Sequence, residues 1–264
     1  MTGTGTENDP YICENWEEFV SAFNEENKYI TFPDDTVIDF NEIQNYSRKL
    51  TGRYNTVLGN GVNFRNITLE TGAFISATDK NTFDNMRFTS LYFTGDASFI
   101  SSSNNNNWCY FINCQFAGIF QGNSKFNDSG DKLYFGNSLS SVGCGINLKL
   151  SEQAVFRATA YSCYCYNCQL TLDCESSATD RSFDIYNSLI DGNIGGANRS
   201  IWAVNCIVNA DIETTLTNSN TSSISVLNSD KIKTGGSSSG FATVTAEQLQ
   251  NAAYLSSIGF PIGV

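Results

Sequence analysis

The sequence contains no histidine, only three prolines and few charged residues. Histidine is the commonest general base and metal ligand in proteins, so its absence excludes the chemistry that depends on imidazole. Charged residues make up 16% of the chain, against roughly 25% in an average globular protein. Asn, Ser and Thr fill their place, and these residues favour strands and turns over helix interiors.

The charge balance is acidic, with a formal net charge of -12 at pH 7. No basic stretch is present, which argues against nucleic acid and anionic membranes as partners. No apolar run is long enough to span a bilayer, so we expect no membrane insertion. The first residues lack the basic and apolar regions of a signal peptide, so we expect synthesis in a reducing cytoplasm.

What the sequence does contain is a series of asparagines in similar surroundings. The residues two and four positions before each Asn are apolar with one exception, Asn81. The spacing is irregular, as in a solenoid whose loops differ in length from coil to coil. The series consists of Asn66, Asn85, Asn113, Asn137, Asn167, Asn187, Asn205 and Asn228.

Each of these asparagines is predicted to form a corner between two strands. Alternate residues of a straight strand face the same side. Here the apolar alternation slips by one residue at the Asn, because the following residue is again small or apolar. Asn tolerates the left-handed backbone that such a corner requires. Stacked corners would also let the side-chain amides hydrogen-bond to one another as a ladder.

This pattern resembles the right-handed parallel β-helix of the pectin-lyase-like superfamily, in which an Asn ladder often occupies the turn between two strands of each coil. The resemblance covers about residues 60–232. It implies an all-β fold, a right-handed parallel β-helix (solenoid), formed by a single domain over residues 1–264.

The two ends are expected to carry short capping helices, because open coils expose apolar surface and strand edges. The first is predicted at 14–26, where apolar residues recur at helical spacing. A flexible linker is predicted at 234–240. A C-terminal helix and an apolar tail are predicted over 245–264, opened by a capping box at Thr245 and Gln248.

The cysteines suggest core packing and no cofactor. Cys163, Cys165 and Cys168 form C-x-C-x-x-C, but no second pair or histidine is near to complete a zinc site. The strand periodicity already places them in the interior, near Cys114 and Cys206. We therefore expect no metal and no cofactor.

Catalysis by carboxylates has weak support in the sequence. Some members of the resembled superfamily cleave polysaccharides with Asp and His residues, and others with calcium, Asp and Arg. The nearest candidates here match no family motif, so we expect no catalytic residue, although a lyase or hydrolase stays open. These candidates are Arg157, Arg181, Asp173, Asp180, Asp184 and Asp191.

Apolar and aromatic residues also occupy positions predicted to face outward. A stripe of this kind usually marks an interface. Three interpretations are open: cover by the chain's own loops, self-association about a three-fold axis, and a platform for sugar rings. The stripe consists of Tyr110, Ile112, Tyr134, Tyr164, Tyr166, Tyr186, Trp202, Val204 and Leu227.

The terminal segments "DPYICENWEEFVSAF", "IDFNEI" and "AAYLSSIGFPIGV" look like those that flank β-helical proteins of bacteriophages of gut bacteria. This resemblance implies a non-enzymatic virion protein: a head or tail fibre, a decoration protein or an adhesin subunit. The expected partners are further copies in a homotrimer, other virion proteins and a host-surface glycan. The alternatives are a polysaccharide-degrading enzyme and a stand-alone glycan-binding module.

Overall fold

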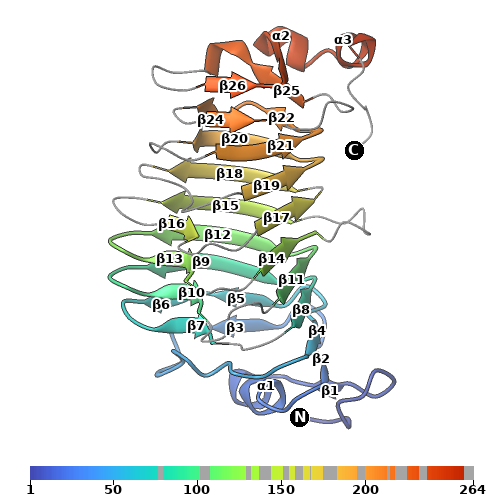
Figure 1. The fold of residues 1–264 in the computed structure, drawn as a ribbon. Coiled ribbons are helices and arrows are strands. Elements are labelled where there is room, and N and C mark those ends of the chain that lie inside the picture. Colours follow the sequence, from blue (N-terminus) through green and yellow to red (C-terminus); the bar gives the residue numbers. More distant parts are fainter. Residues whose placement is uncertain are drawn as a thin grey trace.

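The computed structural model shows a parallel β-solenoid, in which successive coils stack along one axis (Figure 1). The all-β, parallel β-helix prediction is confirmed. The structure describes residues 1–76, 80–101, 108–128, 132–136, 144–150, 155–157, 163–166, 168–174, 183–194, 200–212, 215–217, 225–231 and 237–258.

Three parallel sheets form the walls of the solenoid. Sheet 1 has 11 strands, in the order β1 (Tyr11–Ile12), β2 (Tyr29–Thr31), β4 (Thr56–Leu58), β8 (Asn81–Asp84), β11 (Trp108–Ile112), β14 (Lys132–Phe135), β17 (Cys163–Tyr166), β19 (Phe183–Tyr186), β21 (Ser200–Val204), β24 (Thr215–Thr217) and β26 (Ser237–Ser239). Sheet 2 has four short strands, in the order β7 (Ala73–Ile75), β10 (Ser98–Ile100), β13 (Lys125–Asn127) and β16 (Val155–Arg157).

Sheet 3 has 12 strands and follows sheet 1 along the chain within each coil. Its main path is β3 (Val37–Asp39), β5 (Asn63–Arg65), β9 (Arg87–Phe93), β12 (Gln115–Phe120), β15 (Gly145–Leu150), β18 (Gln169–Cys174), β20 (Leu189–Ile194), β22 (Ile207–Val208), β25 (Ser225–Asn228) and β27 (Phe241–Val244). Off this path, β6 (Thr68–Leu69) pairs with β9, and β23 (Asp211–Ile212) pairs with β20.

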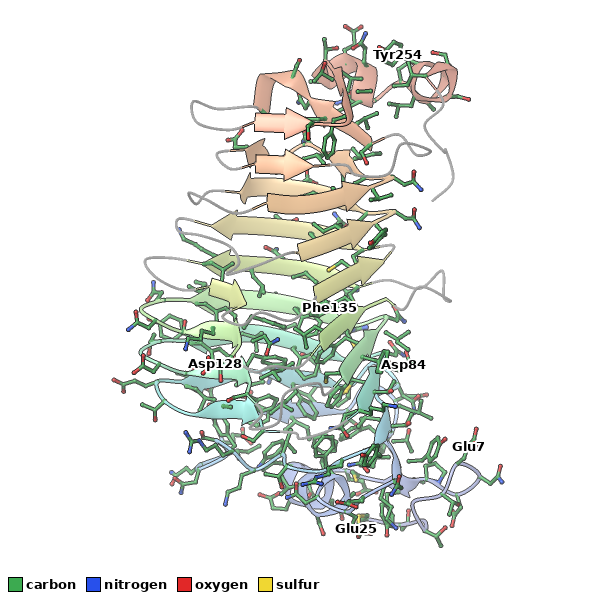
Figure 2. All side chains as sticks on the ribbon, in the orientation of Figure 1. Glu7, Glu25, Asp84, Asp128, Phe135 and Tyr254 are labelled. Carbon is green, nitrogen blue, oxygen red and sulfur yellow. The ribbon has the colours of Figure 1, made fainter. Side chains whose placement is uncertain are left out.

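Stacked aromatic rings fill the interior of the coils up to Phe135, and aliphatic and cysteine side chains fill the described interior after it. Phe83, Phe111 and Phe135 occupy one register position on β8, β11 and β14, and their rings stack at 5.2 and 5.4 Å between centroids. Figure 2 shows Phe135 inside the rod. Phe74, Phe99 and Phe126 form a matching stack under sheet 2. In-register stacking follows from parallel pairing, because each strand places its inward residue above that of the preceding coil.

The helix α1 (Trp16–Phe23) covers the N-terminal end and lies within the predicted 14–26. Asn15 caps it by accepting a hydrogen bond from the Glu18 amide at 3.0 Å. Trp16, Phe19 and Phe23 are buried against the first coils. The helix therefore removes the apolar end of the solenoid from water.

Four of the predicted corner residues share one place in the fold, between sheets 1 and 3. Asn85, Asn113, Asn187 and Asn205 have φ between 48° and 55°, the left-handed region that Asn tolerates. The amide of Asn205 donates to the Oδ1 of Asn187 in the preceding coil at 3.2 Å. Asn137 and Asn167 lie outside the described residues.

Two members of the predicted series are elsewhere. Asn66 also has a positive φ, of 61°, but it follows β5 in sheet 3 and lies level with Ser90 of β9. Asn228 is not a corner: it is the last residue of β25, and its amide donates to Asn209 at 2.9 Å. The apolar residues before Asn228 belong to a strand of sheet 3. They have the same spacing as the apolar residues that precede the true corners.

The single polar exception in the apolar pattern has a structural explanation. Asn81 is 1% exposed, as is Asn55 one coil earlier. The Oδ1 of Asn81 accepts the Asn55 amide at 2.9 Å, and its Nδ2 donates to the Gly52 carbonyl at 3.0 Å. Two buried asparagines in successive coils therefore satisfy backbone groups that a bend before sheet 1 leaves unpaired.

The C-terminal boundaries differ from the prediction. The linker predicted at 234–240 is wrong for Ser237–Ser239, which form β26 in register with β24. Coils also continue past residue 232, since β27 pairs with β25. Backbone pairing with the preceding coil orders these polar residues. Their composition, typical of a flexible linker, therefore gave the wrong prediction.

The C-terminal helices are two short segments, α2 (Ala246–Leu249) and α3 (Ala252–Ser257). The capping box at Thr245 and Gln248 is formed, and Asn251 caps the second helix. Leu255 packs with Val226 and Val244, outward-facing residues of sheet 3. These helices thus cover the outer face of the last strands, and the tail after residue 258 lies outside the described residues.

The left-handed corner at Asn113 generates a stability prediction. Asn113→Ala should lower the free energy of unfolding by about 1–2 kcal/mol, since Ala disfavours positive φ. Asn113→Gly should cost less, because Gly adopts this backbone freely. Urea unfolding of both variants measures the difference. Equal losses for Ala and Gly would mean that the side chain and not the backbone conformation matters.

Candidate ligand-binding groove

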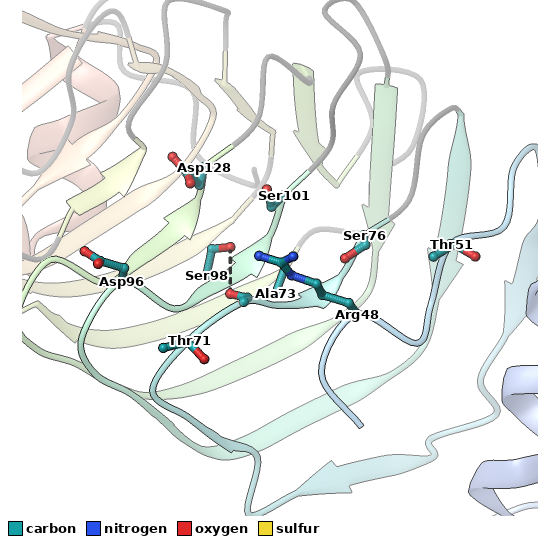
Figure 3. Close-up of a pocket in the computed structure, with 10 residues that line it drawn as sticks. Arg48, Thr51, Thr71, Ala73, Ser76, Asp96, Ser98, Ser101 and Asp128 are labelled. Carbon is teal, nitrogen blue, oxygen red and sulfur yellow. Dashed lines mark hydrogen bonds between the residues drawn. The ribbon is translucent and has the colours of Figure 1, made fainter. Parts of the chain in front are cut away.

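A groove of about 620 Å³ runs over the outside of sheet 2, on the face opposite the Phe74 stack. Its lining residues are polar or charged, except for Gly72 and Ala73 (Figure 3). The lining residues are Arg48, Thr51, Thr71, Gly72, Ala73, Ser76, Asp96, Ser98, Ser101 and Asp128.

Parallel register aligns these residues in rows along the solenoid axis. Leu50, Ile75, Ile100 and Asn127 are level with one another, so the residues that follow them form a row: Thr51, Ser76, Ser101 and Asp128. The backbone amides of Ser76, Ser101 and Asp128 each donate to the preceding coil, at 2.8, 2.9 and 2.8 Å. Neighbouring members of such a row are about 4.8 Å apart.

A central row runs beside it and contains Ala73, Ser98 and Lys125. The Arg48 amide donates to the Ala73 carbonyl at 2.7 Å, which places Arg48 at the head of this row. Thr71 and Asp96 lie two positions before Ala73 and Ser98, on the far edge of the groove. The groove therefore presents hydroxyls and charges at regular intervals along the axis.

The charged side chains of the groove differ in whether they form an ion pair. The Asp128 carboxylate forms an ion pair with the Lys125 ammonium group, with 2.9 Å between Oδ1 and Nζ. Asp96 is exposed, and Arg48 is exposed as well. Ser98 is 2% exposed, and its hydroxyl makes a long hydrogen bond of 3.4 Å to the Gly72 carbonyl. The arrangement suits a polar ligand that carries several hydroxyl groups.

The predicted aromatic stripe is found in part on the outer face of sheet 1. Tyr110, Ile112 and Tyr186 are half-buried there, and Val204 is 8% exposed. Desolvation raises the pKa of the Tyr110 phenol. Leu227 does not belong to the stripe: it lies on β25 in sheet 3 and is 0% exposed. That error follows from the misassigned corner at Asn228.

The remaining stripe residues are known by register only, since their side chains lie outside the described part of the chain. Tyr110, Tyr134 and Tyr164 are level on β11, β14 and β17, and Tyr166 is level with Tyr186 and Val204. Trp202 is level with Asp184, which interrupts the first of these rows. The stripe and the groove lie on different sheets, as the positions of Asp84 and Asp128 in Figure 2 illustrate.

Cys114, Cys144, Cys168 and Cys206 line up in an internal column at the bend before sheet 3. Hydrogen bonds connect successive coils: the Sγ of Cys144 donates to the Phe111 carbonyl at 3.1 Å, and the Sγ of Cys206 donates to the Ile185 carbonyl at 3.4 Å. Ser188 and Ser225 occupy the same column, and their hydroxyls accept the amides of Cys168 and Cys206. These side chains satisfy backbone groups at the bend.

The other chemical candidates are dispersed. Asp173 and Asp191 lie on adjacent strands of sheet 3, Asp184 lies on sheet 1, and Arg157 lies on sheet 2. Arg181 and Asp180 are outside the described residues. Within the described residues, no three His, Cys, Asp or Glu side chains gather as metal ligands, and no helix is long and apolar enough to cross a membrane.

The groove escaped sequence reasoning because its residues belong to different coils. A signal exists: "TGAFIS" at 71–76 and "DASFIS" at 96–101 are near-repeats, and "SKFND" at 124–128 follows the same pattern. Each places a Phe in the core and a polar residue two positions later. This second repeat marks the groove residues in the sequence.

No family model matches the chain, and no curated protein matches it. A crystal structure described as that of a "putative immunoglobulin A1 protease" from Bacteroides ovatus is similar over 96% of this chain and 89% of that chain, with 14% identity and a TM-score of 0.42.

The cysteine column generates a prediction about alkaline stability. Burial raises the pKa of the Cys206 thiol from 9.0 to about 12. The folded state therefore keeps a proton that the unfolded state loses above pH 9, and this contribution disappears as the pH rises toward 12. Over that range the wild type should lose about 1.4 kcal/mol per pH unit from this thiol.

Cys206→Ser tests this prediction, because serine already occupies the column at Ser188 and Ser225. Urea unfolding at pH 8 and pH 10.5 should show a smaller loss of stability in the variant than in the wild type. Identical losses would contradict the assignment of the raised pKa to Cys206.

Proposed function

We propose that this protein is a non-enzymatic structural subunit of a bacteriophage virion, with the pectin-lyase-like right-handed β-helix fold, that attaches to a glycan on the host surface. The observation that carries the proposal is the groove on sheet 2, whose polar rows repeat along the rod axis. A glycan chain is an extended ligand rich in hydroxyls. Rows of Ser, Thr and Asp side chains offer donors and acceptors at intervals that such a chain can follow.

The solenoid itself suits a mechanical role. Parallel pairing is continuous from β1 to β26 in sheet 1, and the core is one contiguous cluster over most of this length. Such a rod holds its groove in a fixed shape, which lowers the entropic cost of binding. Rigid subunits of this kind are what a head or tail fibre, a decoration protein or an adhesin requires.

The outer face of sheet 1 is the proposed surface for self-association. Tyr110, Ile112 and Tyr186 are half-buried apolar residues at outward positions of that sheet, and aromatic residues are enriched at interfaces. A homotrimer formed through this face would leave the grooves on sheet 2 open to solvent. The proposed location is the virion, with other virion proteins as further partners.

A second candidate, a polysaccharide lyase or hydrolase, is favoured by one specific observation. Arg48, Asp96 and Asp128 line the same groove, and an arginine with carboxylates can abstract and return protons during cleavage. Lys125 already neutralises Asp128, which favours binding over catalysis at that position.

Binding and cleavage are separated by one set of assays on the purified protein. We expect capsular or lipopolysaccharide glycans from a host bacterium to be retained on the immobilised protein and recovered at their original length. Ser101→Trp, which fills the groove, should abolish retention, whereas Thr56→Trp on sheet 1 should not. Appearance of shortened or unsaturated products would establish the enzyme instead, and no retention of any host glycan would contradict the proposal.

The oligomeric state is tested by native mass spectrometry. We expect the mass of three chains, and Ile112→Asp should shift the protein to the mass of one chain because it places a charge in an apolar interface. Ile119→Asp, which makes the same change on the exposed outer face of sheet 3, is the matched control. A wild type with the mass of a single chain would contradict self-association and leave the glycan proposal standing.

A further inference from the structure

Arg48 has no ionic partner among the described residues, like Lys49 and Arg87, but of these three only Arg48 lines the groove. Lys28, Arg53, Arg65, Lys125 and Lys231 each form an ion pair with a carboxylate. Among the described residues, no carboxylate forms such a pair with the Arg48 guanidinium. An unpaired guanidinium beside a polar groove is available to an external anion.

The backbone holds Arg48 in an uncommon conformation. Its φ is 57°, in the left-handed region, and its amide donates to Ala73 at 2.7 Å. Non-glycine residues rarely adopt this conformation, and such strain gathers at functional sites. The consequence here is directional, since the side chain extends across Ala73 into the groove (Figure 3).

Small residues beneath Arg48 leave room for this course. Ala73 has only a methyl group at the position the arginine crosses. Gly72, with φ of 82°, lies beside it, and a Cβ there would approach Arg48 Nε to 3.2 Å and collide with Ser47 Oγ. The glycine and the alanine therefore let the guanidinium reach toward Ser98, the next member of the central row.

The carboxylates limit which anions can bind. Asp96 lies on the far edge of the groove, and Asp128 ends the row of hydroxyls. In Figure 3 both carboxylates stand apart from the guanidinium. A polymer with an acid on every residue would meet them as well as Arg48, and like charges repel at close range. A ligand with one acidic group and neutral neighbours would avoid this repulsion.

We infer that Arg48 forms a subsite for a single carboxylate on a glycan, and that the flanking Ser, Thr and Asp residues bind the hydroxyls of neutral sugars beside it. This inference rests on the proposed glycan-binding function and specifies its ligand. The guanidinium provides paired donors that match a carboxylate. Gly72 and Ala73 act as positioning residues for Arg48.

The test compares three probes by calorimetry on the full chain. The first is a trisaccharide with one central uronic acid between neutral sugars, the second is its carboxyl-reduced form, and the third is a triuronide. We expect the first to bind more tightly than the other two. Arg48→Gln should weaken its binding by roughly tenfold to a hundredfold, the worth of a charged hydrogen bond, and leave binding of the reduced probe unchanged.

Two variants control for side effects. Arg87→Gln removes the same charge from the exposed outer face of sheet 3, and should leave all three affinities unchanged. Asp96→Asn should strengthen binding of the triuronide relative to that of the reduced probe. Thermal unfolding of each variant confirms that the coil is intact.

The outcomes are distinguishable. Equal binding of the first two probes, or equal weakening of both by Arg48→Gln, would overturn the carboxylate subsite while the glycan-binding function stands. Tightest binding of the triuronide would overturn the limit set by Asp96 and Asp128. No binding of any probe, combined with no retention of host glycans, would overturn the function itself.

Discussion

The structure depends on one constraint: every coil must return to the register of the coil before it. Backbone hydrogen bonds between parallel strands impose this requirement along three sheets. Side chains at the bends maintain it. Asn205 bonds to Asn187, Asn81 to Asn55, and the Cys and Ser column to carbonyls of the preceding coil. Phenylalanine stacks add contact between the same positions of successive coils.

Register also creates the groove. Thr51, Ser76, Ser101 and Asp128 are distant in sequence and become one row only because their coils stack in step. A repeated register turns single polar residues into a line of hydrogen-bonding groups with a fixed interval. The solenoid thereby offers an extended ligand a surface of matching length, without any loop that must fold around it.

Much of the fold followed from local patterns. The left-handed corners at Asn85, Asn113, Asn187 and Asn205 were visible because the apolar alternation slips at each one. The helix at Trp16–Phe23 was visible because its apolar face has helical spacing. Asn228 was wrongly predicted to be a corner, and Leu227 was therefore wrongly assigned to sheet 1. The apolar residues before Asn228 match the corner pattern, and only the pairing of β25 shows that they belong to sheet 3.

The candidate groove was harder to predict from the sequence, for a physical reason. Loop lengths vary between coils, so sequence spacing does not show which residues become level. Arg48 gave no local signal, because its place in the groove depends on its backbone bond to Ala73 in the next coil. The near-repeat of "AFIS" and "SFIS" was a usable clue, since it marks the same register position twice.

The most direct test is a crystal structure of the protein with a bound host oligosaccharide. Ligand density should lie along sheet 2, with the sugar chain parallel to the solenoid axis and contacts to Ser76, Ser101 and Asp128. Density on the outer face of sheet 1, or across the coils instead of along them, would contradict the central claim that register builds the binding site.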